Sequence, residues 1–342
     1  MQTRKSIQIW LIPALLAFAA GALAGESEFS GYMFGDYYWV QAHRDSAIEG
    51  SNGFWFRRIY FTYQQKIDKQ FTIRLRLEMN SRGDFGTTSA ALVPYIKDAY
   101  LKWKKDRTEV LLGISEAPTW RVLEKFWGYR SVEKTPLDLQ RWGSSRDFGV
   151  AIRGKAARND LFRYYFMLAN GSGNKSEINR GKKLMATLGL HPGNFIFELY
   201  GDWNDNTGRR DFYTGQVFVG YKTRLFRVGL HYAHQLRQHP DAPDERLNLL
   251  SAFAVLKASE KVNLFARMDR NFDPNSRAAR QAYLPFDPSV GNVFLLGGFE
   301  YVVYDQFQIM PNIEAIVYDK NDATGVTPKT DVVPRITFFY QF

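Results

Sequence analysis

Four arginines occur in segments where polar and apolar residues alternate. Arg74 and Arg76 alternate with apolar side chains between residues 71 and 80, and Arg58 and Arg335 hold similar positions in two other segments. A period of two places such residues on one face of a β-sheet. Guanidinium groups keep their charge and bind phosphate or carboxylate through paired hydrogen bonds. If these segments are neighbours, the four arginines form a basic wall that attracts small anions.

Carboxylates accompany this predicted wall. Asp36 and Glu78 share its faces. Salt bridges to these carboxylates would neutralise the arginines and leave no preference for anions. We predict the anion preference, and the neutralised wall remains the alternative.

A second group of functional candidates lies between residues 116 and 145, the longest connection between the predicted strands. Its basic residues and two of its tryptophans are Arg121, Lys125, Arg130, Arg141, Trp120 and Trp127. A disordered surface loop does not need several tryptophans, so we expect this segment to pack against a sheet. The alternative is an external loop that packs on its neighbours or on another subunit. The two tryptophans also suggest a stacking surface for sugars.

Residues for catalysis are scarce. The chain contains no cysteine, which excludes thiol chemistry and a disulfide scaffold. His231 and His234 are three positions apart on a predicted strand, so they face opposite sides and do not form a metal pair. No Gly-x-Ser-x-Gly motif or phosphate loop is present. We predict no enzymatic activity, cofactor or metal, although a Ser–His lipid hydrolase remains an alternative.

Sixteen predicted strands position these residues. Alternation is clearest in residues 71–80, 262–269 and 307–317. Residues 247–257 are ambiguous, and the strand before Asp305 is apolar on both faces apart from Glu300. Seven short turns alternate with eight longer loops at about 43–53, 81–94, 116–145, 171–181, 204–209, 237–245, 271–291 and 319–330. This pattern favours an all-β transmembrane antiparallel barrel over a sandwich.

The last strand ends on an aromatic residue. Phe338, Tyr340 and Phe342 share one face with Ile336, while Arg335, Thr337 and Gln341 lie on the other. This segment resembles the assembly signal of bacterial outer-membrane barrels, which implies contact with a barrel-assembly machinery. The alternative is an edge strand of a soluble sheet, but an exposed apolar edge invites aggregation.

The first residues predict export. Arg4 and Lys5 precede an apolar stretch, and Ala22-Leu23-Ala24 fits the small-x-small rule for cleavage. We predict a signal peptide over residues 1–24 and a barrel domain over residues 25–342. An uncleaved membrane anchor is the alternative. The mean hydropathy of −0.35 does not exclude a barrel, because half of each strand faces a polar interior.

Four segments together resemble the phosphate-selective porin O/P family. They are Phe56–Phe61, Ile96–Trp103, Val110–Gly113 and Ser145–Val150, the last with an Arg-Asp-x-Gly element. The resemblance implies a sixteen-stranded, usually trimeric channel whose third loop folds into the lumen, with basic residues along an anion path. The chain departs from the family pattern at residues 113–118, where the long loop begins.

Together these features predict an outer-membrane porin that passes small hydrophilic solutes by diffusion and prefers phosphate or other small anions. We expect Arg58, Arg74, Arg76 and Arg335 to line the pore and residues 116–145 to constrict it. Expected partners are membrane lipid, lipopolysaccharide and two further copies of the chain, but not nucleic acid. A lipid hydrolase and a plugged structural barrel remain alternatives.

Overall fold

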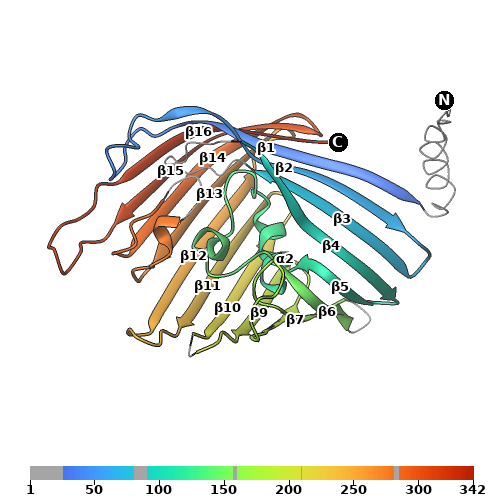
Figure 1. Ribbon diagram of the computed structural model, residues 1–342. Helices are drawn as coiled ribbons and strands as arrows, with labels where there is room; N and C mark the ends of the chain where they lie inside the picture. Colours follow the sequence, from blue (N-terminus) through green and yellow to red (C-terminus); the bar gives the residue numbers. More distant parts are fainter. Residues whose placement is uncertain (1–25, 81–90, 157–159, 209, 281–284) are drawn as a thin grey trace, which may run out of the picture.

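The strands form one closed antiparallel barrel (Figure 1). The computed structural model describes residues 26–80, 91–156, 160–208, 210–280 and 285–342. The predicted signal peptide, residues 1–24, lies outside the described residues, as do parts of four predicted connections. Within the part of the chain that the structure describes, no helix is long and apolar enough to cross a membrane.

Sixteen strands are present, and each pairs with its neighbours in sequence. β1 also pairs with β16, which closes the barrel, with Tyr32 opposite Gln341 and Tyr38 opposite Arg335. The predicted all-β barrel is therefore confirmed. The strands are β1 Ser27–Trp39, β2 Asn52–Lys66, β3 Phe71–Asn80, β4 Val93–Lys105, β5 Thr108–Glu116, β6 Arg146–Ala156, β7 Phe162–Ala169, β8 Lys183–Leu190, β9 Phe195–Asn204, β10 Phe212–Lys222, β11 Phe226–Arg237, β12 Glu245–Lys257, β13 Val262–Asn271, β14 Asn292–Tyr304, β15 Phe307–Tyr318 and β16 Asp331–Gln341.

The outer surface of the barrel is apolar because alternate side chains of every strand point outward. On β3, Ile73 and Leu75 are exposed. Arg74 and Arg76, which alternate with them, are partly covered inside the barrel. On β16, Ile336 is 50% exposed and its neighbour Arg335 only 3%. An apolar outer band with polar residues inside is the pattern of a transmembrane barrel.

Two β-bulges change which residues face the lumen. The register of β2 shifts where Phe34 pairs with Arg58 and Gly35 with Phe56, which leaves Arg57 as an extra residue. Beyond this bulge the faces are exchanged. Unbroken alternation along β2 would place Trp55 on the outer face with Ile59, but its Nε1 donates a hydrogen bond to the buried Asp36 at 3.0 Å.

The second bulge lies in β4, where the partners of Arg76 and Leu77 are Asp98 and Ile96. It adds Lys97 to the inner face, where Nζ of Lys97 lies 2.9 Å from Glu78. Each bulge thus places an additional cation inside the barrel.

The long connection between β5 and β6, residues 117–145, folds into the lumen, as predicted, and is called the inner loop. It contains α2 (Pro118–Trp127) and the short α3 (Pro136–Leu139). Figure 1 shows α2 within the ring of strands. Pro118 begins α2, where its missing N–H costs nothing. Gly128 ends α2 with a φ of 75°, a conformation that favours glycine. A further short helix, η1 (Ala278–Arg280), lies in a long loop outside the strands.

Candidate functional site: a narrowed lumen

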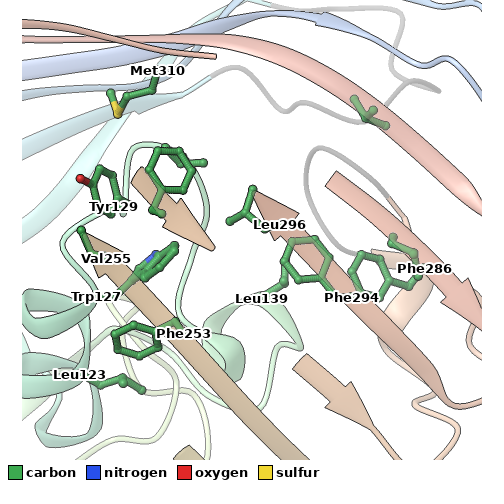
Figure 2. Packing of buried hydrophobic residues seen from close by; sticks show 14 of the residues in the cluster. Leu123, Trp127, Tyr129, Leu139, Phe253, Val255, Phe286, Phe294, Leu296 and Met310 are labelled. Atoms are coloured by element: carbon green, nitrogen blue, oxygen red, sulfur yellow. The ribbon is translucent and has the colours of Figure 1, made fainter. Parts of the chain in front are cut away.

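The inner loop packs on the barrel wall through two apolar clusters, one mainly on β5–β9 and a larger one mainly on β10–β16. Its side chains Leu123, Trp127, Tyr129 and Leu139 meet apolar residues of β12, β14 and β15 (Figure 2). The wall residues in this cluster include Phe218, Phe253, Val255, Phe265, Phe294, Leu296, Met310, Ile316 and Val333. This contact explains the two strands whose alternation was weak in the sequence. The inner faces of β12 and β14 are apolar because the inner loop covers them.

Three arginines of the barrel wall contact residues 131–134 of the inner loop. Arg57 donates hydrogen bonds to the carbonyl of Ser131 at 3.0 Å and to Glu133 at 3.0 Å. Arg267 donates to the carbonyl of Lys134, and its guanidinium lies over the Trp127 ring. Arg57 was missed by the sequence analysis, because alternation without the bulge places it on the outer face.

Arg335 is the third of these arginines. It lies 2.6 Å from Glu314 and 3.5 Å from Glu133 of the inner loop. Asp36 completes this buried ionic cluster, at 3.4 Å from Arg57. Arg335 is therefore covered by the inner loop, and its part in ion selection stays a prediction.

Burial shifts the pKa values of the ionisable groups on the inner loop. Burial disfavours the charged form of Glu133, but Arg57 and Arg335 outweigh that effect and lower its pKa. Burial lowers the pKa of Lys134 to about 8. Burial also raises the pKa of Glu124, although Arg130 opposes this shift. Burial, followed by the charge of Arg121, lowers the pKa of Lys125.

The other predicted wall arginines lie next to carboxylates. Asp98 accepts contacts from Arg74 at 3.2 Å, Arg76 at 3.7 Å and Arg146 at 2.5 Å. The three side chains remain partly exposed, at 20%, 15% and 13%. Three cations therefore surround one anion, so this Asp98 cluster keeps an excess of positive charge. In the sequence, only the Arg-Asp-x-Gly element of the family resemblance indicates a role for Arg146.

Arg58 contacts a different carboxylate. Its Nε lies 2.6 Å from Glu78, which also contacts Lys97. Arg58 is 7% exposed. Glu78 thus lies between two cations, and the alternative of carboxylate pairing applies to each of the four predicted arginines.

The predicted residues of the inner loop fall into two groups. Arg121 lies 3.0 Å from Glu116, and Arg130 lies 3.5 Å from Glu124, while Lys125 and Arg141 are exposed. Trp120 and Trp127 are each 1% exposed and donate their indole N–H to backbone carbonyls of the inner loop. The suggested sugar-stacking role of these tryptophans is therefore wrong, because neither ring is accessible to a solute.

Cavities lie on both sides of the Asp98 cluster and the inner loop. At the long-loop end of the barrel, a cavity of about 620 Å³ is lined by Lys97, Asp138, Arg141, Arg146 and further residues. At the short-turn end, two cavities of about 420 and 980 Å³ share Arg121 and Arg163. The lumen is thus narrowed between two wider, mainly basic spaces.

The histidines do not form a reactive centre within the described residues. His231 is fully buried, whereas His234 lies 3.0 Å from Asn248 on the opposite face of β11, as predicted. The described ranges contain no group of three or more histidine and acidic side chains that could hold a metal ion.

Comparison with known proteins identifies the fold but not a family. No family model and no curated protein match the sequence. An anion-selective porin from Comamonas acidovorans has a TM-score of 0.69 and 11% identity, covering 93% of this chain and all of that chain. OmpF of Salmonella typhi, solved with daunomycin, has a TM-score of 0.68 and 11% identity, covering 93% of this chain and 98% of OmpF. OmpT of Vibrio cholerae has a TM-score of 0.64 and 11% identity, with the same coverages.

These identities establish the fold alone. The chain has the fold of the bacterial outer-membrane porins, a multi-pass β-barrel with an apolar outer face. The narrower resemblance to the phosphate-selective porin O/P family is not confirmed, because no family model matches.

Proposed function

We propose that the protein is a passive diffusion porin of the outer membrane that prefers small anions, phosphate among them. The observation that supports this proposal most directly is the Asp98 cluster, in which Arg74, Arg76 and Arg146 contact a single carboxylate beside the inner loop. In a narrow lumen with low-dielectric walls, such an excess of fixed positive charge raises the local concentration of anions. Solutes pass by diffusion, and no bond is made or broken.

The cavities beside the constriction support the same preference. The larger short-turn cavity is lined by one described carboxylate, Asp160, and by the cations Arg121, Lys125, Arg163, Lys222, Arg224 and Arg227. Anions that approach from this end meet a basic surface before the constriction. In this proposal Arg74 and Arg76 act on the passing ion, while Arg335 holds the inner loop and Arg58 is paired with Glu78.

The cellular setting is part of the proposal. Export by residues 1–24 and recognition of Phe338, Tyr340 and Phe342 by an assembly machinery would deliver the barrel to the outer membrane. The basic long loops would meet lipopolysaccharide phosphates. A homotrimer is supported by OmpT of Vibrio cholerae, solved in a trimer form. An apolar depression of about 810 Å³ on the outer face of β10–β15 also supports it. The mass of the detergent-solubilised protein by light scattering tests the trimer.

Single-channel recording in a planar bilayer tests the proposed function. Folded protein should give stable conductance steps and, under a KCl gradient, a reversal potential that favours chloride. Inorganic phosphate should then block the chloride current. A cation-favouring potential would overturn the anion preference and leave the porin. Absence of conductance would overturn the porin in favour of a plugged barrel or, if purified protein turned over phospholipid, a lipid hydrolase.

A further inference from the structure

A buried carboxyl group faces the smaller short-turn cavity. Glu198 on β9 is 2% exposed, and its Oε1 has no hydrogen-bond partner among the described residues. Thr187 on the neighbouring β8 is 5% exposed, and its hydroxyl is equally without a partner there. Both residues line a cavity of about 420 Å³. Unpartnered polar groups at this depth cost free energy, so most are paired in folded proteins.

A cation lies in the same row across the sheet. In the strand register, Arg163 of β7 is opposite Gly189 of β8, and Gly189 is opposite Glu198 of β9. Two strand spacings separate the backbones of Arg163 and Glu198, which is about 10 Å. Within the described ranges Arg163 forms no ion pair, and its buried Nε has no hydrogen-bond partner. The carboxylate of Asp160 on the adjoining turn already pairs with Lys155 and Arg107.

Gly189 lies between these two side chains, and its lack of a side chain lets the His191 ring approach closely. A Cβ atom on Gly189 would lie 3.1 Å from Nε2 of His191 and 3.6 Å from Cβ of Arg163. That His191 nitrogen is also buried and has no partner among the described residues. Burial, with the charges of Arg163 and Lys155, lowers the pKa of His191 to about 4, so the ring is neutral. Four unpartnered polar atoms therefore surround Gly189, on Arg163, Thr187, His191 and Glu198.

We propose that the Arg163–Gly189–Glu198 row is a binding site for a small zwitterionic solute, an amino acid or short peptide that carries one carboxylate and one ammonium group. Arg163 receives the carboxylate of the solute and Glu198 its ammonium group. Thr187 and His191 supply hydrogen bonds beside Gly189. A solute with both charges compensates both side chains at once, which a simple anion does not.

This site differs from the Asp98 cluster in position and in chemistry. The Asp98 cluster has an excess of cations, whereas the row offers one guanidinium and one carboxyl group. Binding to it does not depend on conduction. A failure of binding therefore leaves the porin proposal standing, and an absence of conductance leaves the binding site testable.

Isothermal titration calorimetry on the folded full chain in detergent tests the site at pH 7. The probes are glycylglycine, acetate and methylammonium chloride. Glycylglycine should bind at least about tenfold more tightly than either singly charged probe. Glu198→Gln removes the carboxyl group that receives the ammonium, and Gly189→Val places a side chain between Arg163 and His191, so each should weaken glycylglycine binding by about tenfold or more. The control Glu260→Gln changes an exposed carboxylate in a short turn and should bind like the wild type.

Two results would overturn the proposal. One is equal binding of the three probes, because the two charges would then act independently or not at all. The other is glycylglycine binding that survives both Glu198→Gln and Gly189→Val. Thermal unfolding separates a binding role from a structural one. Removal of an unpartnered buried carboxyl should leave the melting temperature unchanged or raise it. A clear fall would assign Glu198 a structural role and count against the site.

Discussion

The two halves of the inner wall differ in chemistry. From β10 to β16 the wall carries buried apolar side chains such as Phe253 and Phe294, and the inner loop packs on them. From β3 to β6 it carries charged residues such as Arg74 and Arg153, which stay partly exposed around the buried Asp98 and other carboxylates. These apolar side chains, together with a second cluster on β5–β9, hold the inner loop, and the charged residues lie beside the remaining lumen. One barrel thus combines a protein core with a polar passage.

The ionic contacts follow the same division. Arg57 and Arg335 are fully buried beneath the inner loop, together with Asp36, Glu133 and Glu314. Their role is to hold the inner loop, because a buried charge is stable only with its partners. Where the wall is open, by contrast, the pairing around Asp98 is incomplete and a net charge remains. We infer that burial, more than residue type, decides which arginines stabilise the fold and which act on solutes.

The largest expected effect comes from loss of a buried arginine. Arg57→Ala removes a partner of Glu133 and the donor to the Ser131 carbonyl. We expect the free energy of unfolding to fall by about 3–5 kcal/mol, because a charge is left under-compensated in the interior. Urea unfolding in detergent, followed by tryptophan fluorescence, measures this loss.

The matched control is Arg270→Ala, at a partly exposed pair with Asp319. That change should cost no more than about 1 kcal/mol. Equal losses for the two variants would contradict the distinction between the buried and open regions.

A smaller effect is expected for Lys134 of the inner loop. Its pKa falls to about 8 in the folded protein, so between about pH 8 and 10.5 the unfolded chain binds more protons than the folded one. Stability should therefore rise with pH across this interval. Lys134→Met should be more stable than the wild type at pH 7, by about 1–3 kcal/mol, and the advantage should vanish near pH 10.5.

Unfolding at a series of pH values checks the Lys134 prediction. The exposed Lys261→Met serves as the control and should show no pH-dependent difference from the wild type. A constant advantage of Lys134→Met at all pH values would mean that packing, and not the lysine charge, causes it.

The charged half predicts a change in selectivity without a large change in stability. Replacement of both Arg74 and Arg76 by alanine leaves Asp98 with Arg146 alone. The excess positive charge disappears, so the permeability ratio of chloride to potassium should fall severalfold. The reversal potential under a KCl gradient measures this ratio. Lys66→Ala, at an exposed pair with Glu26, is the control. An unchanged ratio in the double variant would remove Arg74 and Arg76 from ion selection.

The smallest expected effect concerns Glu124 on α2. Burial raises its pKa, so this carboxylate takes up a proton at a higher pH than an exposed glutamate does. The loss of this negative charge should shift the reversal potential modestly towards chloride between pH 7 and 5. Glu124→Gln should show part of that preference already at pH 7 and a weaker dependence on pH. An identical pH dependence in the wild type and the variant would exclude Glu124 as its source.

The strands were predictable from local patterns. Ile73, Leu75 and Leu77 alternate with Thr72, Arg74 and Arg76, and side chains of a strand face alternate sides for geometric reasons. The inner loop was predictable as a packed segment from Trp120 and Trp127. The strands of β10–β16 against which it packs were only partly indicated, by segments that are apolar on both faces.

Two kinds of residue escaped prediction. Arg57 and Lys97 face the lumen only because a bulge inserts an extra residue, and bulges leave no clear mark in a single sequence. Nothing in the sequence sets Glu198 and Arg163 apart from the other charged residues of the strands. Their lack of partners depends on Gly189 between them, which becomes meaningful only when three strands are placed in register.

The sequence by itself determined the strand count, the closed barrel and the long inner segment, because alternation and turn chemistry act over a few residues. Only the tertiary structure decided which charges are compensated. Arg335 and Arg74 look alike in sequence, yet one is buried with Glu314 and Glu133 and the other shares Asp98 with two further arginines. The reason is physical. The free energy of a charge depends on burial and on partners from distant strands, and register, bulges and loop packing set both.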